Sequence, residues 1–345
     1  MKRQGRYRGT RKRIGLLIPT LVVLCVLAAV ALYVIDNNTT FTREGSFVFD
    51  KKEETPENVE TTLIIDETDG TSVAEEIKEE TPVRIDEALV TKALFLPIGT
   101  VKSTELFDAE LSSAKSLDVN TLVLEVKAED GSLAFATETK IGKKMGLAGD
   151  SEALLSAVSK ARAEGYRVAF YMSCFRDNEA ARKNAPSAVR TANKVLWIDG
   201  ENLRWISPYS EDAVAYITEL IGEMSAFSPN EIILSNVSFP AIGKPELIAY
   251  EDGGVAKDDK LSEFVALARA AAGSIKLSAV YENYKDNALV ESGQKKEAFA
   301  SSFDTVYINE VGGKKTASFA EVSASFENAV VISKSPTGSE YLIKE

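Results

Sequence analysis

The feature that most constrains the fold is an alternation of short apolar segments with helical ones, from about Val90 onwards. The apolar segments are short and lack an alternating polar face, which is typical of strands that are covered on both sides in a parallel sheet. Seven are predicted strands and Tyr341–Ile343 is a candidate eighth; the seven are Ala93–Pro97, Thr121–Val126, Arg167–Met172, Glu231–Leu234, Lys276–Val280, Thr305–Ile308 and Val330–Ser333.

Helices are predicted between these strands, and one of them shows the helical period clearly. This helix is Tyr209–Phe227, and Ser207 followed by Pro208 predicts its N-cap and first turn. Its apolar side chains that fall on one stripe are Ala213, Tyr216, Ile217, Leu220, Ile221 and Met224. The predicted helices are Glu105–Leu117, Ser151–Glu164, Tyr209–Phe227, Lys260–Ala272 and roughly Lys295–Ser301.

Alternating strands and helices over about 255 residues predict an α/β fold, with a (β/α)8 TIM-barrel-like domain at residues 90–345. The alternative is a doubly wound open sheet. A nucleotide-binding version of that sheet has little support, because no glycine-rich fingerprint follows any predicted strand.

The first 35 residues predict a membrane anchor. Residues 1–13 contain seven Lys and Arg and no acidic residue, which predicts a cytoplasmic basic tail. Residues 14–35 contain no charged residue, and at about 1.5 Å per residue a helix of this length crosses the hydrocarbon core, about 30 Å thick. The rest of the chain would then be extracytoplasmic. The alternative is a cleaved signal peptide, with Ala29-Val30-Ala31 as its cleavage site.

Residues 36–89 predict a mostly disordered acidic linker. They contain 16 Asp and Glu against five Lys and Arg, with few aromatic residues and no sustained apolar period. Such a segment cannot bury enough apolar surface to offset the entropy lost on ordering. Only Thr62–Ile65 is a candidate for local strand pairing.

Composition excludes several kinds of chemistry. The chain has no histidine, which removes Ser-His-Asp catalysis and histidine-based zinc sites. Its two cysteines, Cys25 and Cys174, form no paired framework, so we expect no metal site and no cofactor. The folded part is acidic, so we expect no nucleic-acid partner.

Several motifs occur in an order that a known family shares. The first motif is an apolar strand that contains a glutamate and ends in a lysine, at residues 123–127, followed by Asp-Gly at residues 130–131. The second is a Phe-Arg-Asp turn at residues 175–177. Two tryptophans, an aspartate and Pro-Tyr come next, and Phe239-Pro240 follows the predicted strand Glu231–Leu234. From about Val90 to Pro240 the chain resembles a family of uncharacterised bacterial, glycoside-hydrolase-like TIM barrels, relatives of the α-amylase-like glycosidases.

This resemblance implies a TIM barrel and a carbohydrate-related activity, but the chain departs from the family pattern at two places. The family's Asp-Tyr-x-Arg before Phe-Pro is replaced by Ser235, Asn236, Val237 and Ser238, so the expected acid and cation are missing there. The family's arginine after the third strand also has no counterpart in Met172-Ser173-Cys174.

Acidic residues that follow predicted strands are the catalytic candidates, because glycoside hydrolysis needs two carboxylates flanking the bond. They are Glu125, Glu282 and Glu310, and the alternative is that these are ordinary exposed loop acids. Trp197 and Trp205 could stack on sugar rings or fill the core, and for Asp199 a turn-capping role is favoured over a ligand contact. The predicted ligand-binding residues are Lys127, Asp130, Asp177, Trp197, Asp199, Trp205, Tyr209, Ser235 and Asn236.

Three functions are compatible with these residues. The first is a membrane-anchored, extracytoplasmic protein that binds a cell-envelope or other carbohydrate, such as the peptidoglycan glycan, with little or no hydrolysis. The second is an active glycosidase with a relocated carboxylate pair, such as Glu125 with Glu282 or Glu310. The third is a structural or interaction module of the cell envelope without a sugar ligand.

Overall fold

The computed structural model describes residues 39–41, 47–49, 90–147 and 151–344, and the chain divides into two units, Met1–Pro82 and Val83–Glu345. The first unit contains an antiparallel pair of strands, β1 (Thr39–Phe41) and β2 (Phe47–Phe49). This pair lies within the predicted disordered linker and was not predicted. Threonine, valine and phenylalanine favour strands, and the polar composition of the whole segment concealed these two short runs.

The predicted membrane anchor at residues 14–35 and the candidate strand at 62–65 lie outside the described residues. Within the part of the chain that the structure describes, no helix is both long and apolar enough to cross a membrane.

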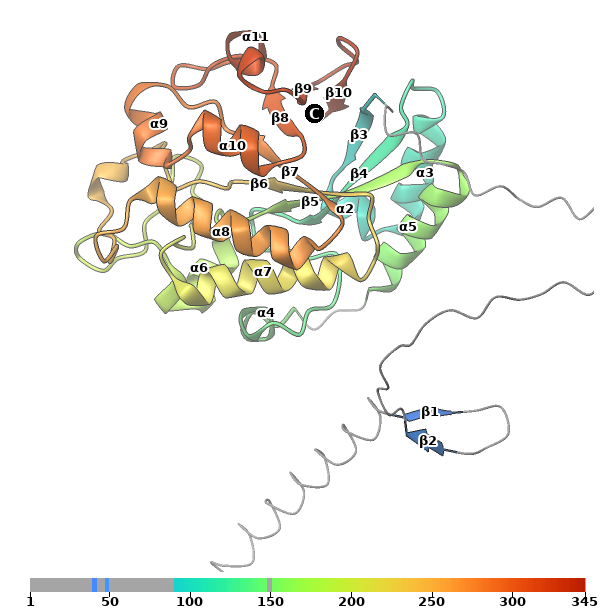
Figure 1. The fold of residues 1–345 in the computed structure, drawn as a ribbon, viewed down its shortest axis with the longest axis horizontal. Coiled ribbons are helices and arrows are strands. Elements are labelled where there is room, and N and C mark those ends of the chain that lie inside the picture. Colours follow the sequence, from blue (N-terminus) through green and yellow to red (C-terminus); the bar gives the residue numbers. More distant parts are fainter. Residues whose placement is uncertain (1–38, 42–46, 50–89, 148–150, 345) are drawn as a thin grey trace, which may run out of the picture. The chain divides into compact units, whose positions relative to one another are not determined.

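The second unit is a closed barrel of eight parallel strands in the order β10-β3-β4-β5-β6-β7-β8-β9 (Figure 1). The predicted TIM barrel is therefore confirmed, the open-sheet alternative is wrong, and the candidate eighth strand closes the barrel. The strands are β3 (Lys92–Leu96), β4 (Thr121–Lys127), β5 (Arg167–Ser173), β6 (Glu231–Ser235), β7 (Lys276–Tyr281), β8 (Val306–Asn309), β9 (Ala329–Ser333) and β10 (Tyr341–Ile343).

Helices surround the barrel, and the two longest, α7 and α8, lie side by side across one part of the sheet (Figure 1). The five predicted helices correspond to α3 (Thr104–Ala114), α5 (Glu152–Ala163), α7 (Glu211–Ser225), α8 (Lys257–Ala272) and α10 (Lys296–Ser302). Shorter helices were not predicted: α2 (Ile98–Val101), α4 (Lys140–Met145), α6 (Asn178–Lys183), α9 (Asp286–Ser292), α11 (Phe319–Val322) and the 3-10 turns Ala185–Ser187, Pro245–Leu247 and Ser323–Ser325.

Helix α7 begins later than predicted. Ser210 is its N-cap, and the Ser210 Oγ accepts a hydrogen bond from the Ala213 backbone N–H at 3.4 Å. Ser207 instead forms a turn in which its Oγ accepts from the Tyr209 N–H at 3.2 Å. The predicted apolar stripe is confirmed, because all of its members are buried: Ala213, Tyr216, Ile217, Leu220, Ile221 and Met224.

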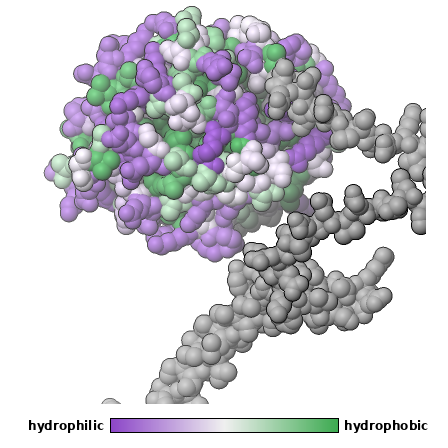
Figure 2. Space-filling view, in the orientation of Figure 1, coloured by the Kyte–Doolittle hydropathy of each residue, from purple (hydrophilic) through white to green (hydrophobic). Residues whose placement is uncertain are grey.

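Two separate apolar cores hold the barrel together. The larger lies between the sheet and the helices and includes Cys174, where burial raises the pKa of the thiol to about 12 and keeps it unreactive. The smaller fills the inside of the barrel with Ala93, Val123, Ala169, Tyr171, Ile233, Val280, Tyr307, Val330, Ile332 and Leu342. On the outside, Figure 2 shows a mostly hydrophilic face with scattered apolar residues, as expected for a folded domain.

A buried ion pair links β4 to α6. The Lys127 Nζ lies 2.8 Å from the Asp177 Oδ2, and both side chains are fully buried. Lys127 also donates to the Ser173 carbonyl oxygen at 2.8 Å, and the Asp177 Oδ1 caps α6 by accepting from the Ala180 N–H at 2.8 Å. Each charge thus has a partner, which a buried charge requires.

The substitution Asp177→Ala is expected to destabilise the domain by about 3–5 kcal/mol, because it leaves the Lys127 ammonium buried without a counter-charge and removes the cap of α6. Denaturant unfolding measures this difference. The matched control is Lys143→Met, which breaks the exposed ion pair with Glu138 and should change stability by less than about 1 kcal/mol. Equal losses in both variants would contradict the structural role of the buried pair.

Candidate functional site

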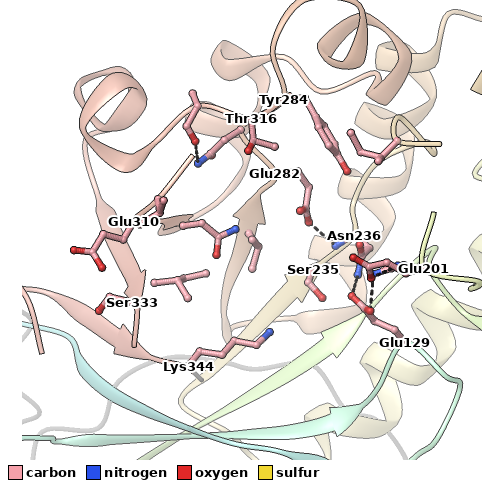
Figure 3. A pocket seen from close by; sticks show the side chains of 18 of the residues that line it. Glu129, Glu201, Ser235, Asn236, Glu282, Tyr284, Glu310, Thr316, Ser333 and Lys344 are labelled. Atoms are coloured by element: carbon pink, nitrogen blue, oxygen red, sulfur yellow. Dashed lines mark hydrogen bonds and ion pairs between the residues drawn. The ribbon is translucent and has the colours of Figure 1, made fainter. Parts of the chain in front are cut away.

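A cavity of about 660 Å³ opens at the C-terminal ends of the barrel strands, which is where TIM barrels carry their sites. Its lining is rich in charged and polar groups (Figure 3). The acids are Glu129, Asp199, Glu201, Glu282 and Glu310; the cations are Arg176, Lys334 and Lys344; the larger aromatic residues are Tyr171, Trp205 and Tyr284.

Asn236 connects two of these carboxylates. Its backbone N–H donates to the Glu282 Oε1 at 3.2 Å, and its side-chain Nδ2 donates to the Glu129 Oε1 at 3.0 Å (Figure 3). Asn236 follows β6 directly and has a φ of +52°, a left-handed conformation that asparagine tolerates better than most residues. Glu129 follows β4 and Glu282 follows β7, so one residue on the strand end between them brings both acids to one place.

Arg176 holds the acidic side of the cavity together. Its guanidinium contacts the Glu129 Oε2 at 2.7 Å, the Asp199 Oδ2 at 2.8 Å and the Glu201 Oε2 at 2.6 Å. The Asp199 Oδ2 also accepts from the Trp205 Nε1 at 3.0 Å. Burial alone would raise the pKa of Asp199, but hydrogen bonds from Trp205 and from two backbone N–H groups, together with the Arg176 charge, lower it overall. Asp199 is therefore a firmly ionised anchor for Arg176.

Glu282 is in the opposite electrostatic situation. Burial raises the pKa of this carboxyl group to about 7, and the nearby Glu129 charge adds to the increase, while the Asn236 N–H, Lys344 and Arg176 oppose it. A carboxyl group that keeps its proton near neutral pH can act as a general acid.

Six of the residues predicted to form the site line this cavity: Asp199, Trp205, Ser235, Asn236, Glu282 and Glu310. Ser235 ends β6 and its Oγ donates to the Met172 carbonyl oxygen at 3.2 Å, so it forms part of the floor. Glu310 is exposed at the rim, and Figure 3 shows its carboxylate directed away from Glu282. Glu125 does not line the cavity, so the predicted pairing of Glu125 with Glu310 is not found there.

Six other predicted residues do not line the cavity. Glu125 accepts a hydrogen bond from the Ile98 N–H at 2.9 Å, at the start of α2, and burial raises the pKa of its carboxyl group. Asp130 is exposed and forms a turn by accepting from the Ser132 N–H. The predicted pair of Glu125 with Glu282 is thus replaced by Glu129 with Glu282.

Lys127 and Asp177 form the buried ion pair described above and do not reach the cavity. A bulge in β4 explains why Lys127 faces away from it. Residues 125 and 127 pair with the adjacent residues 171 and 172 of β5, so the alternation of β4 shifts by one residue. Tyr171 belongs to the core inside the barrel and Met172 to the outer core, so the shift turns Lys127 outwards, away from the cavity.

Trp197 and Tyr209 are also structural. Trp197 is buried in the outer core, and its Nε1 donates to the Lys244 carbonyl oxygen at 3.0 Å. Tyr209 packs against the rings of Phe239 and Tyr250, and its hydroxyl donates to the Val255 carbonyl oxygen at 2.8 Å. Neither tryptophan presents a free face for a sugar, because Trp205 is only 4% exposed.

Four further residues line the cavity that were not predicted as site residues: Glu129, Arg176, Tyr284 and Lys344. No arginine occurs at Met172-Ser173-Cys174, but Arg176, two residues further on, supplies a cation from the loop that follows β5. A signal for Glu129 was present, since it follows the bulged strand and precedes the Asp130-Gly131 turn. Lys344 follows β10, whose place in the barrel was uncertain from the sequence alone.

The closed parallel barrel with a polar cavity at the C-terminal ends of its strands is a TIM barrel. Residues 93–307 match a family described as "Putative glycosyl hydrolase domain", which covers more than half of the chain. The chain belongs to this family, as the order of its motifs predicted.

Several solved structures match part of the chain. A hypothetical protein from Ruminiclostridium thermocellum is 25% identical, with 54% of this chain and 96% of that chain covered and a TM-score of 0.49. The pneumococcal virulence factor StrH is 13% identical, with 68% of this chain and 63% of that chain covered and a TM-score of 0.44. The α-galactosidase TtGalA from Thermus thermophilus is 12% identical, with 63% of this chain and 41% of that chain covered and a TM-score of 0.41. No curated protein matches the chain.

The raised pKa of Glu282 predicts a pH-dependent stability difference between the wild type and Glu282→Gln. The folded pKa of about 7 exceeds the ordinary value of 4.5, so ionisation disfavours folding as the pH rises through this interval, whereas glutamine is neutral throughout. Between about pH 4 and about pH 8, we expect the free energy of unfolding of the variant to rise by roughly 2 kcal/mol relative to that of the wild type. This is less than the full pKa difference implies, because the half-buried carboxyl group is partly screened by solvent.

Denaturant unfolding at a series of pH values measures this gain. The control is Asn309→Ala, an uncharged change on the same rim, which should differ from the wild type by a constant amount at every pH. A constant difference for Glu282→Gln as well would show that the pKa of Glu282 is not raised.

Proposed function

We propose that this protein is a glycoside hydrolase in which Glu282 is the general acid and Glu129 is the second carboxylate. The observation that carries the proposal is the contact of Asn236 with both acids, which places them together in the cavity of a TIM barrel of a glycosyl hydrolase family. This corresponds to the active glycosidase with a relocated carboxylate pair that the sequence left open, with Glu129 in place of Glu125.

The two acids differ in the way that this reaction requires. Glu282, with a pKa of about 7, is protonated in much of the neutral range and can donate its proton to the glycosidic oxygen as the bond breaks. Glu129 lies 2.7 Å from the Arg176 guanidinium and accepts from Asn236, so its orientation is fixed. Its carboxylate can attack the anomeric carbon and form a glycosyl-enzyme that water then hydrolyses, or it can take a proton from a water molecule that attacks this carbon directly.

The surrounding groups keep this arrangement in place. Asp199 and Glu201 bind the remaining edge of Arg176, so the guanidinium cannot leave Glu129 without breaking further ion pairs. The Glu282 backbone N–H donates to the Gln294 Oε1 at 3.2 Å, which fixes the end of β7. Tyr284 is half-buried in the cavity wall and offers an aromatic face to a sugar ring.

A second candidate, carbohydrate binding without hydrolysis, is favoured by one observation. The end of β6 has Ser235, Asn236 and Ser238 where the family resemblance leads one to expect an acid and a cation. In that case the Glu129 carboxylate would serve only to hold Arg176 and Asn236. The two candidates differ in whether a bound glycan is cleaved.

Product release from a panel of glycans, including peptidoglycan and neutral and acidic polysaccharides, tests the proposal. Glu282→Gln and Glu129→Gln are each expected to reduce kcat by about 10²–10⁴, as removal of a general acid or of the partner carboxylate does. The pH profile of kcat/KM should fall as the pH rises above about 7, where Glu282 loses its proton in the free enzyme.

The matched control is Glu219→Gln, which makes the same chemical change on the exposed face of α7 and should leave kcat unchanged. Binding without cleavage by the wild type would favour the second candidate. Full activity of both active-site variants would refute the assigned roles.

We also propose that residues 14–35 anchor the domain in a membrane with the basic residues 1–13 in the cytoplasm, so that the barrel acts outside the cell. The proposal is supported by the apolar segment and its seven flanking cations. The full chain should sediment with membranes and resist release by high salt, whereas a variant lacking residues 14–35 should be soluble. Release of the full chain by salt alone would contradict an anchor.

A further inference from the structure

The charges in the cavity are divided between two sides. The acids Glu129 and Glu282 follow strands β4 and β7, and Arg176 is fully engaged with carboxylates on that side. Across the cavity, the ends of β9 and β10 contribute Lys334 and Lys344. The charge of Arg176 is therefore balanced by the carboxylates that it contacts, whereas the two lysines lie on the β9–β10 side of the cavity.

Lys344 is held in place by aromatic groups. Its Nζ donates to the Tyr171 hydroxyl oxygen at 3.0 Å and lies 4.3 Å from the centre of the Tyr171 ring and 4.5 Å from that of Phe95. The Lys344 backbone N–H donates to the Ser333 carbonyl oxygen at 2.8 Å, which fixes the base of the side chain. Figure 3 shows the side chain extending into the cavity towards Ser235.

This cation has no carboxylate partner among the described residues. No Asp or Glu oxygen of residues 90–147 and 151–344 lies within the 4.0 Å that defines an ion pair with its Nζ. A lysine ammonium has three donors, and the Tyr171 hydroxyl takes one. Burial alone lowers the pKa of Lys344, but Tyr171 and the more distant Glu125 and Glu129 raise it overall, so the group stays charged.

We propose that Lys344 is a specificity determinant that binds the carboxylate of an acidic saccharide, so that the cavity takes glycans bearing a uronic acid or a lactyl carboxylate. This inference rests on the proposed function, because it names the substrate class of the same cavity. A half-buried ammonium ion that lines the cavity and is held against two adjacent aromatic rings is a preformed site for a carboxylate.

The neighbouring groups agree with this assignment. Lys334 is exposed on the same rim and adds positive charge at the entrance. Glu310, the acid of the adjacent strand end, is exposed and turned outwards in Figure 3. The sugar carboxylate would thus meet cations on the β9–β10 side, and the scissile bond would face Glu129 and Glu282.

The experiment compares acidic glycans with their carboxyl-reduced forms, in which each carboxylate has become a primary alcohol. The probes are oligogalacturonate and hyaluronan oligosaccharides for the uronic acids, and peptidoglycan glycan-strand fragments for the lactyl group. The full chain carrying Glu282→Gln, which slows turnover, is titrated calorimetrically with each pair. At least one acidic probe should bind roughly tenfold or more tightly than its reduced form, as a charge-assisted hydrogen bond predicts.

Substitution of the lysine then tests the residue. Lys344→Met should abolish the preference for the acidic form while leaving the affinity for the reduced form within about twofold, and Lys344→Arg should retain most of the preference. The matched control is Lys314→Met, an exposed lysine outside the cavity lining, which should change neither affinity. Thermal unfolding of each variant establishes that it is folded.

The outcomes separate the two proposals. Equal binding or cleavage of acidic and reduced glycans, or a preference that persists in Lys344→Met, overturns the role of Lys344 and leaves the glycosidase proposal standing. Absence of both binding and cleavage for every glycan overturns the glycosidase proposal and this inference with it.

Discussion

Closure of the barrel is the constraint on which the site depends. β10 pairs in parallel with both β9 and β3, so that Tyr341 lies opposite Val331 on one side and Lys92 on the other. Because every strand runs in the same direction, closure brings all the C-terminal strand ends into one ring. Residues that are more than 200 positions apart, such as Glu129 and Lys344, therefore line one cavity.

Within that ring, two local departures from regular strand geometry decide which side chains face the cavity. The bulge in β4 turns Lys127 into the outer core, and the loop beyond it carries Glu129 to the cavity. The left-handed backbone of Asn236 ends the alternation of β6 and directs both its N–H and its amide at carboxylates. Bulges and strained residues of this kind are concentrated at functional sites.

The fold could be predicted from the sequence to a large extent, and the site only in part. Apolar runs bounded by turn residues indicated seven strands and a candidate eighth, because burial on both faces leaves a signal in each strand separately. Glu282, Asp199 and Asn236 could be placed near the site because they follow strands or belong to a family motif. Lys127 and Trp197 were assigned wrongly, because neither the β-bulge nor the side on which a tryptophan is buried has a signature in a short sequence segment.

The sequence by itself determined the alternation of strands and helices, the absence of histidine chemistry and membership of a glycosyl hydrolase family. These properties depend on local composition and on the order of motifs. Only the tertiary structure decided that Glu129 rather than Glu125 lies in the cavity with Glu282, and that Arg176 forms ion pairs with the acids there. It also decided that Lys344 has no carboxylate partner among the described residues. Those outcomes depend on distances between separate strands, which barrel closure sets and which no single segment of the chain encodes.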